Sequence, residues 1–153
     1  MTTDINRIYS TRRLGIVNAL VEKLKTIDGN GDFNTDVYNN VHPRLKFWDE
    51  VKEFPSIHVN AGGERREYQA SGFKDRFLSI TLRVYVQDED PTEALEELLE
   101  DIETVIEANS RLEYRDRRGL DNFTQQITII SIDTDEGVLE PLGVGEILLE
   151  VRY

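Results

Sequence analysis

The chain has 153 residues, which suits one domain with a real core, and 39% of them are hydrophobic. It contains no cysteine, which excludes disulfides, thiolate metal sites and cysteine nucleophiles. Its formal net charge of −12 argues against general binding to DNA or anionic membranes, because phosphate contacts need Lys and Arg. No apolar run approaches the roughly 18 residues of a membrane span, and the N-terminus lacks the apolar core of a signal peptide, so we expect synthesis and assembly in the cytoplasm.

The first predicted element is an amphipathic helix from about Ser10 to Lys25. Apolar residues recur in it at helical spacing and should form the buried stripe. These residues are Leu14, Val17, Leu20, Val21 and Leu24.

The stretch Thr26 to Val41 begins like a calcium-binding EF-hand loop, since Asp and Asn alternate with glycine in DGNGD. Such a loop needs glycine at position 6 and glutamate at position 12, and this chain has Phe33 and Asn39 there. We therefore predict no metal site but a surface turn, in which glycine permits left-handed backbone and Asp and Asn bond their own backbone.

The middle of the chain predicts strands. Residues 36–41 form a candidate short strand, LKFWDEV a helical turn, and FPSIHVNAG a strand with Ile57 and Val59 on one face. An extended polar arm around residues 61–76 follows, either a hairpin or a flexible segment. The clearest strand is RFLSITLRVYV, whose inward face should carry Leu78, Ile80, Leu82, Val84 and Val86.

The second helix has strong signals at its start. Asp90 is a good N-cap, Pro91 suits the first helical position, and Glu93 completes a capping-box pattern. Its apolar stripe comprises Leu95, Leu98, Leu99, Ile102, Val105 and Ile106. A loop around residues 109–122 and two strands, NFTQQITIISID and VGEILLEVRY, complete the chain.

This order predicts an α+β fold: a mostly antiparallel sheet of about four to five strands with two amphipathic helices packed on one face. With no internal repeat and no low-complexity linker, residues 1–153 should make a single domain.

Signals for chemistry are weak. Only His42 and His58 titrate near neutrality, and neither belongs to a metal-ligand pattern. The chain has no phosphate-binding loop and no nucleophile elbow. We therefore predict a protein without enzymatic activity, without a cofactor and without a metal.

The charge distribution is more informative. Residues 88–107 carry ten acids and no Lys or Arg, and the acidic face of the predicted helix should comprise Glu93, Glu96, Glu97, Glu100, Asp101, Glu103 and Glu107. Basic residues gather elsewhere, and the candidates for a subunit interface are Arg65, Arg66, Lys74, Arg76, Arg111, Arg115, Arg117 and Arg118. These charges either solvate the surface or let the basic segments of one subunit meet the acidic helix of the next, in a heterologous ring.

Four stretches together give a resemblance: IVNALVEKLKTI, DGNGDFNTDVYNNV, FWDEVKEFPSIHV and RFLSITLRVYVQDEDPTEALEELLEDIE. Their order resembles that of the tail terminator, or tail-completion, proteins of long-tailed bacteriophages. The resemblance implies a structural virion protein that forms a ring, commonly of six subunits, on the end of the tail tube. Such a ring stops tube polymerisation, joins the tail to the neck, and in contractile phages can touch the sheath.

The resemblance also implies partners: other copies of the chain, the tail tube protein and a neck protein. DNA would pass through the ring without specific binding, and the acidic face of residues 88–107 is a hypothetical lining for that channel. The alternatives are another neck or head–tail connector component, and an acidic protein-binding module unrelated to phage.

Overall fold

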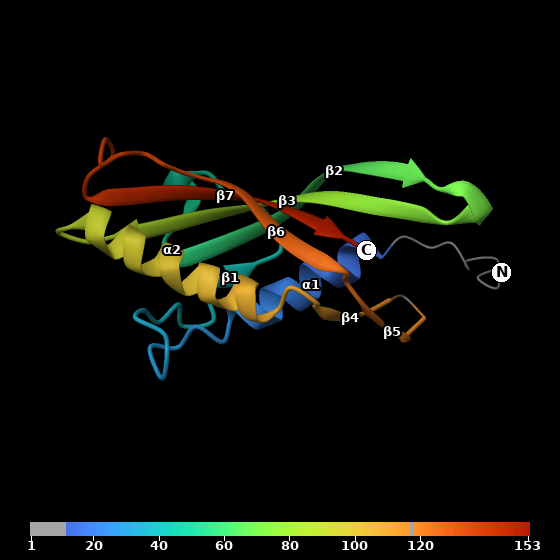
Figure 1. The fold of residues 1–153 in the computed structure, drawn as a ribbon. Helices are drawn as coiled ribbons and strands as arrows, with labels where there is room; N and C mark the ends of the chain where they lie inside the picture. Colours follow the sequence, from blue (N-terminus) through green and yellow to red (C-terminus); the bar gives the residue numbers. More distant parts are fainter. Residues whose placement is uncertain (1–11, 117) are drawn as a thin grey trace, which may run out of the picture.

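The computed structural model describes residues 12–116 and 118–153 (Figure 1). The helices are α1 (Arg13–Leu24) and α2 (Pro91–Ala108), with 3-10 turns η2 (Trp48–Glu50) and η3 (Ala70–Gly72). The main strands are β1 (Val41–His42), β2 (Ser56–Tyr68), β3 (Lys74–Gln87), β6 (Gln126–Thr134) and β7 (Leu142–Arg152). A separate hairpin is made of β4 (Glu113–Arg115) and β5 (Asp121–Phe123).

The five main strands form one sheet in the order β1-β2-β3-β7-β6, antiparallel except for the β1–β2 pair. Both helices lie against the same face of it, as Figure 1 shows. The predicted α+β class is thereby confirmed. The core fills the space between helices and sheet, because every second residue from Leu78 to Val86 of β3 and from Ile147 to Val151 of β7 is apolar and buried.

Helix α1 buries an apolar stripe that is shifted from the predicted one. Val17, Leu20, Val21 and Leu24 are buried as expected, but Leu14 is 61% exposed and Ile16 is fully buried in its place. Leu14 and Ile16 lie on opposite sides of the stripe at 3.6 residues per turn, and the fully buried side is that of Ile16, Leu20 and Leu24, which are spaced four residues apart. The predicted start at Ser10 lies outside the described residues.

Helix α2 forms as predicted, with all six residues of its apolar stripe buried. The Asp90 side chain accepts a hydrogen bond from the Glu93 amide at 3.2 Å, so the N-cap is confirmed. The predicted capping box is incomplete, because it requires the Glu93 side chain to accept a hydrogen bond from the Asp90 amide. That amide instead donates to the carboxylate of Asp88 at 2.9 Å.

Of three segments between the main elements, two differ from expectation and one forms as predicted. The first strand occupies only Val41–His42, and it pairs in parallel with β2. The Asp28 stretch forms the predicted surface turn, where the Asp28 carboxylate accepts from the Asn30 amide at 3.0 Å and Gly29 has φ +78°. The predicted loop at 109–122 contains the β4–β5 hairpin, and the segment read as one strand from Asn122 divides into β5 and β6.

The polar arm is a regular hairpin. Strands β2 and β3, of 13 and 14 residues, stay paired from Ser56↔Tyr85 to Tyr68↔Lys74, with one bulge between Ala61 and Glu64. The hairpin therefore extends well beyond the helices that cover the rest of the sheet (Figure 1).

Gly15 of α1 allows the β4–β5 hairpin to lie against the helix, because a Cβ there would stand 2.4 Å from the Arg115 carbonyl oxygen. Alanine favours an isolated helix by about 1 kcal/mol over glycine. We nevertheless expect Gly15→Ala to destabilise the protein by about 1–3 kcal/mol, because the obstructing atom belongs to the backbone. Urea unfolding monitored by circular dichroism measures this. Gly63→Ala, where a Cβ meets nothing within 4 Å, is the matched control, and equal stability of the two variants would contradict the prediction.

Candidate assembly surfaces

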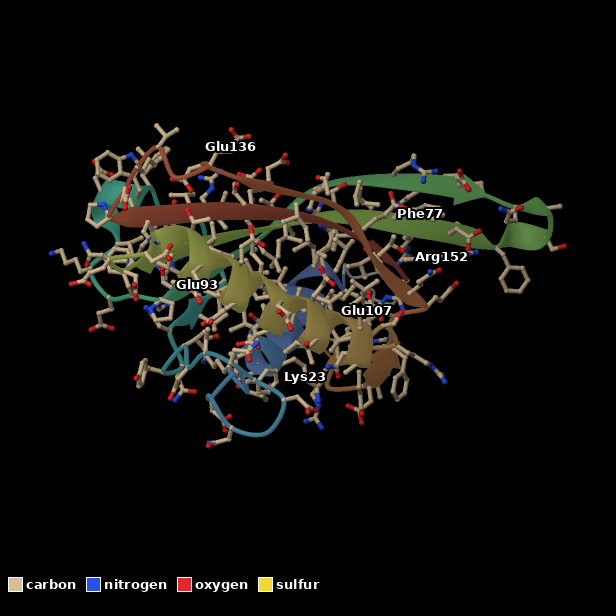
Figure 2. The ribbon with its side chains drawn as sticks, turned by 60° about the vertical axis from the view of Figure 1, so that its left-hand side comes forward. Lys23, Phe77, Glu93, Glu107, Glu136 and Arg152 are labelled. Atoms are coloured by element: carbon tan, nitrogen blue, oxygen red, sulfur yellow. The ribbon has the colours of Figure 1, made fainter. Side chains whose placement is uncertain are left out.

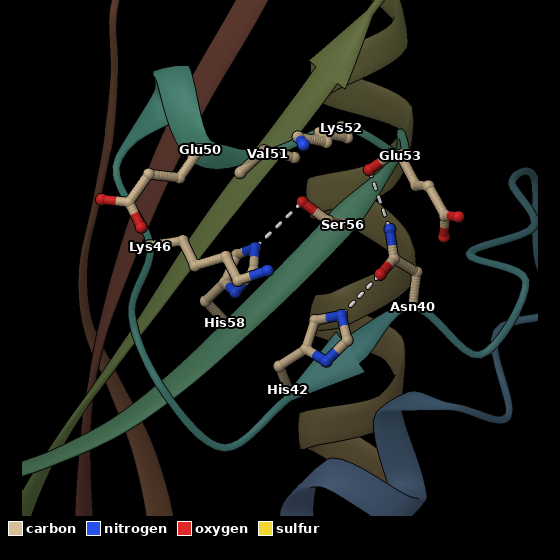
Figure 3. A pocket seen from close by; sticks show the side chains of 9 residues that line it. All are labelled: Asn40, His42, Lys46, Glu50, Val51, Lys52, Glu53, Ser56 and His58. Carbon is tan, nitrogen blue, oxygen red and sulfur yellow. Dashed lines mark hydrogen bonds between the residues drawn. The ribbon is translucent and has the colours of Figure 1, made fainter.

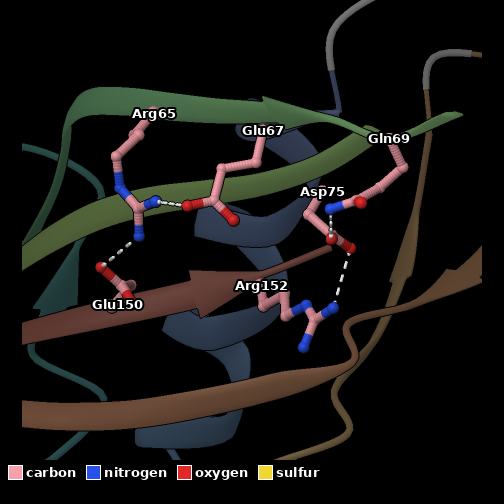
Figure 4. Close-up of polar contacts among 6 residues, drawn as sticks. All are labelled: Arg65, Glu67, Gln69, Asp75, Glu150 and Arg152. Atoms are coloured by element: carbon pink, nitrogen blue, oxygen red, sulfur yellow. Dashed lines mark hydrogen bonds and ion pairs between the residues drawn. The ribbon is translucent and has the colours of Figure 1, made fainter. Parts of the chain in front are cut away.

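The basic residues of the β2–β3 hairpin are partly neutralised within the chain. Arg65 pairs with Glu67 on its own strand and lies 3.9 Å from Glu150 of β7 (Figure 4). Its guanidinium also stacks 4.1 Å from the centre of the Phe77 ring. Because its own subunit already contacts it on three sides, Arg65 is poorly placed to pair with an acid of another subunit.

Arg66 is occupied in the same way, since its Nε lies 2.6 Å from the carboxylate of Glu64, which is almost wholly buried. Hydrogen bonds from the Tyr153 hydroxyl and from Arg66 lower the pKa of Glu64 despite its burial. Among the described residues, Lys74 and Arg76 form no ion pair and instead face aromatic rings, those of Tyr68 and Tyr153.

The second basic cluster lies on and beside the β4–β5 hairpin. Arg115 is 3.3 Å from Asp121, Arg118 is 3.5 Å from Asp116, and Arg111 stacks over the Phe123 ring at 4.8 Å. Arg117 lies outside the described residues. The Arg115–Asp121 pair is largely exposed, and such pairs contribute only about 0.2–1 kcal/mol, so its members can exchange partners at little cost.

The fold brings the two basic clusters to the same end of the molecule. Figure 1 shows the β4–β5 hairpin on the side towards which the β2–β3 hairpin extends, with the C-terminus between them. Tyr153 links the two regions, because the guanidinium groups of Arg12 and Arg76 lie 5.2 and 5.4 Å from the centre of its ring. Arg12 in turn approaches Asn122 of β5 at 3.4 Å. The sequence shows two separate groups, and the tertiary structure makes them neighbours.

The acidic face of α2 is present but lacks one predicted member. Six of the seven candidates are exposed, and none of them forms an ion pair with a described residue: Glu93, Glu96, Glu97, Glu100, Glu103 and Glu107. Figure 2 shows Glu93 and Glu107 near opposite ends of the helix. The uncompensated charge therefore extends along the whole of α2.

Asp101 is the exception, because it is fully buried. Its carboxylate accepts hydrogen bonds from the backbone amides of Asn34 and Thr35 at 2.7–3.0 Å and from the Thr35 hydroxyl at 2.6 Å. The prediction that Asp101 belongs to the acidic face was wrong. It lies within the apolar stripe, three residues after Leu98 and four before Val105, and that spacing is the signal that could have revealed it.

The two histidines lie together in a hollow beside β1 and β2 (Figure 3). Their rings stack with centroids 5.3 Å apart. The Nδ1 of His58 donates to the Arg44 carbonyl at 3.2 Å, which leaves Nε2 to accept from the Ser56 hydroxyl at 3.0 Å. Burial, then the nearby His42, lower the pKa of His58 to about 4.

This Ser–His pair has the spacing of an activated nucleophile but not its access. Both Ser56 and His58 are only 1% exposed, so no substrate carbonyl could approach the hydroxyl. The pair therefore serves the packing of the loop over β2.

The described residues also contain no group of three His, Asp or Glu side chains placed to hold a metal ion. Within the same residues, no helix is long and apolar enough to cross a membrane.

Comparison with known proteins gives one consistent answer. The family model described as Bacteriophage Tail Tube Terminator Protein matches residues 10–153. The chain is 36% identical over 149 residues to the tail tube terminator protein p142 of Escherichia phage T5, covering 92% of each chain. Its fold matches a chain in the virion of a native gene transfer agent particle with a TM-score of 0.59, at 9% identity, covering 94% of this chain and 97% of the other.

The matched family is structural, and its members are virion tail components and not enzymes, as the sequence predicted. The chain therefore belongs to the bacteriophage tail tube terminator protein family.

Proposed function

We propose that six copies of this chain form a closed ring that caps the tail tube, ends its polymerisation and presents a surface to the neck of the head. The observation that carries this proposal is the 36% identity, over nearly the whole length of both chains, to the terminator of phage T5. It also favours a terminator over an acidic binding module unrelated to phage. The tail tube protein and a neck protein are then the direct partners.

The charges of the described residues support assembly by contact between unlike surfaces. The acidic face of α2 carries six glutamates without an ion pair in the described chain, and the exposed cations Arg115 and Arg118 lie on a different element. A ring of identical subunits repeats such a heterologous contact until it closes. Complementary charges then set the register and speed the encounter.

An acidic ring also suits the passage of DNA. Duplex DNA carries about one negative charge per 1.7 Å of its axis, and cations would hold it by releasing counterions. A subunit with a formal charge of −12 repels it instead, so DNA can pass without being bound. The glutamates of α2 that are not used between subunits would contribute to this repulsion.

Electron microscopy of tail tubes mixed with the purified protein tests the proposed function directly. We expect a ring on one end of each tube, and tubes of fixed length when the protein is present during polymerisation. Decoration along the tube wall, or tubes that keep growing in the presence of the protein, would overturn the proposal.

Reversal of the exposed cations should weaken the ring while leaving the fold intact. We expect Arg115→Glu combined with Arg118→Glu, with or without Arg117→Glu, to reduce the fraction of capped tubes at least tenfold, because each change replaces attraction to α2 by repulsion. Circular dichroism should be unchanged, since the side chains of Arg115 and Arg118 are both exposed. Lys23→Glu, an exposed cation on α1, is the matched control. Normal capping by the double variant would exclude the β4–β5 hairpin from the interface.

A further inference from the structure

The tip of the β2–β3 hairpin presents two aromatic rings to solvent. Tyr68 and Phe73 flank η3 and are 72% and 73% exposed. The tip is well formed, because the Gln69 amide donates to the Phe73 carbonyl at 2.7 Å and Tyr68 pairs with Lys74. Large aromatic side chains that become buried in a partner's pocket contribute most to an interface, so two rings on a well-formed projection make an apolar anchor.

An apolar hollow lies at the opposite end of the molecule. It has a volume of about 610 Å³ and is lined by η2 and the β6–β7 connection, with Trp48, Phe54, Val138, Leu139 and Pro141 among its residues. Trp48 is 55% and Val138 80% exposed, so nothing in the described chain covers it. Figure 1 shows the β6–β7 connection and the β2–β3 turn at opposite ends of the sheet. A single molecule therefore cannot fill its own hollow.

The charges of the two ends are complementary. At the tip, the acids are neutralised, since Asp75 lies 2.9 Å from Arg152 and Glu67 pairs with Arg65, while Lys74 forms no ion pair with a described residue (Figure 4). The hollow is bordered by Asp49 and Glu140, which form none with the described residues either. A cationic tip thus faces an anionic rim if the two surfaces meet.

We propose that the aromatic tip of one subunit inserts into this hollow of the next copy of the same chain. Tyr68 and Phe73 would contact Trp48 and Val138, with Lys74 directed at Glu140. The contact joins unlike surfaces at opposite ends, so it propagates from copy to copy and closes only as a ring. This inference rests on the proposed ring and identifies one of the contacts that hold it together.

The absence of cysteine makes the contact measurable by disulfide formation without background. One variant carries Phe73→Cys and the other Val138→Cys, and the two are mixed under oxidising conditions, free and on tail tubes. We expect at least tenfold more mixed disulfide dimer than when Phe73→Cys is mixed with Leu14→Cys. Leu14 is 61% exposed on α1 and lies outside both surfaces, so it measures random collision. Equal yields in the two mixtures would overturn the proposal.

The single tryptophan supplies an independent readout, because Trp48 lies in the hollow. Its fluorescence should shift to shorter wavelength when subunits assemble on tubes, and the shift should be lost in Tyr68→Ser combined with Phe73→Ser, whose circular dichroism should stay native. An undiminished shift in that variant would show that the tube protein fills the hollow and would overturn the proposal. Capped tubes without excess cross-linking would remove only this inference. Excess cross-linking by a protein that never caps tubes would remove only the proposed function.

Discussion

Replacement of Asp101 by alanine is expected to destabilise the protein by about 3–5 kcal/mol, the usual cost of removing one partner from a buried charged network. The loss should be large because the carboxylate is the acceptor for two backbone amides, of Asn34 and Thr35, and for the Thr35 hydroxyl. All three donors would be left without their partner. Since Asn34 and Thr35 lie on the connection between α1 and β1, the substitution also releases that connection from α2.

Urea unfolding followed by circular dichroism measures the loss, and hydrogen exchange at the Asn34 and Thr35 amides localises it. Asp101→Asn should cost less than Asp101→Ala, because one side-chain oxygen remains to accept. Glu103→Gln is the matched control, since it removes a carboxylate from the same helix at an exposed position. If Asp101→Ala were as stable as the control, the buried network would have no energetic role.

Acidification should remove stability in a window set by His58. Its pKa is about 4 in the folded protein against 6.5 for a free histidine, so between these values the unfolded chain binds more protons and stability falls as pH falls. One such group costs about 2 kcal/mol between pH 7.5 and pH 5, and up to about 3 kcal/mol when titration is complete. His42, whose pKa burial also lowers, acts in the same direction.

The cause is the hollow around His58, where burial opposes the charged form and a proton on the stacked His42 would add repulsion. Lys46 and Arg83 act in the same direction, and only the hydrogen bond to the Arg44 carbonyl favours the cation. The pH dependence of urea unfolding from pH 7.5 to 5 tests this. His58→Gln, which keeps a donor and an acceptor but cannot titrate, should flatten the curve. The carboxylate of Glu64, with its lowered pKa, loses its contribution only below about pH 4.5, outside this window.

The sequence by itself determined the elements whose signals are local. The alternation in β3, the period of α2 and the Asp90 cap each depend on a few consecutive residues, and all of them appear in the structure. Regular strands and helices repeat the same geometry at each step, so the pattern of apolar residues is sufficient to place them. The resemblance to the terminator family could be recognised from the sequence for the same reason, because it depends on the order of such local elements along the chain.

Only the tertiary structure decided which charges are free. Asp101 and Glu103 are both acids in one acidic helix, yet one is buried under Asn34 and Thr35 and the other faces solvent. Arg65 and Arg66 look like Arg115 in the sequence, but the first two are held by the sheet. The hollow at Trp48 and Val138 likewise unites segments ninety residues apart. Electrostatic and apolar contacts act through space, and the distance between two side chains is fixed only once the whole chain has folded.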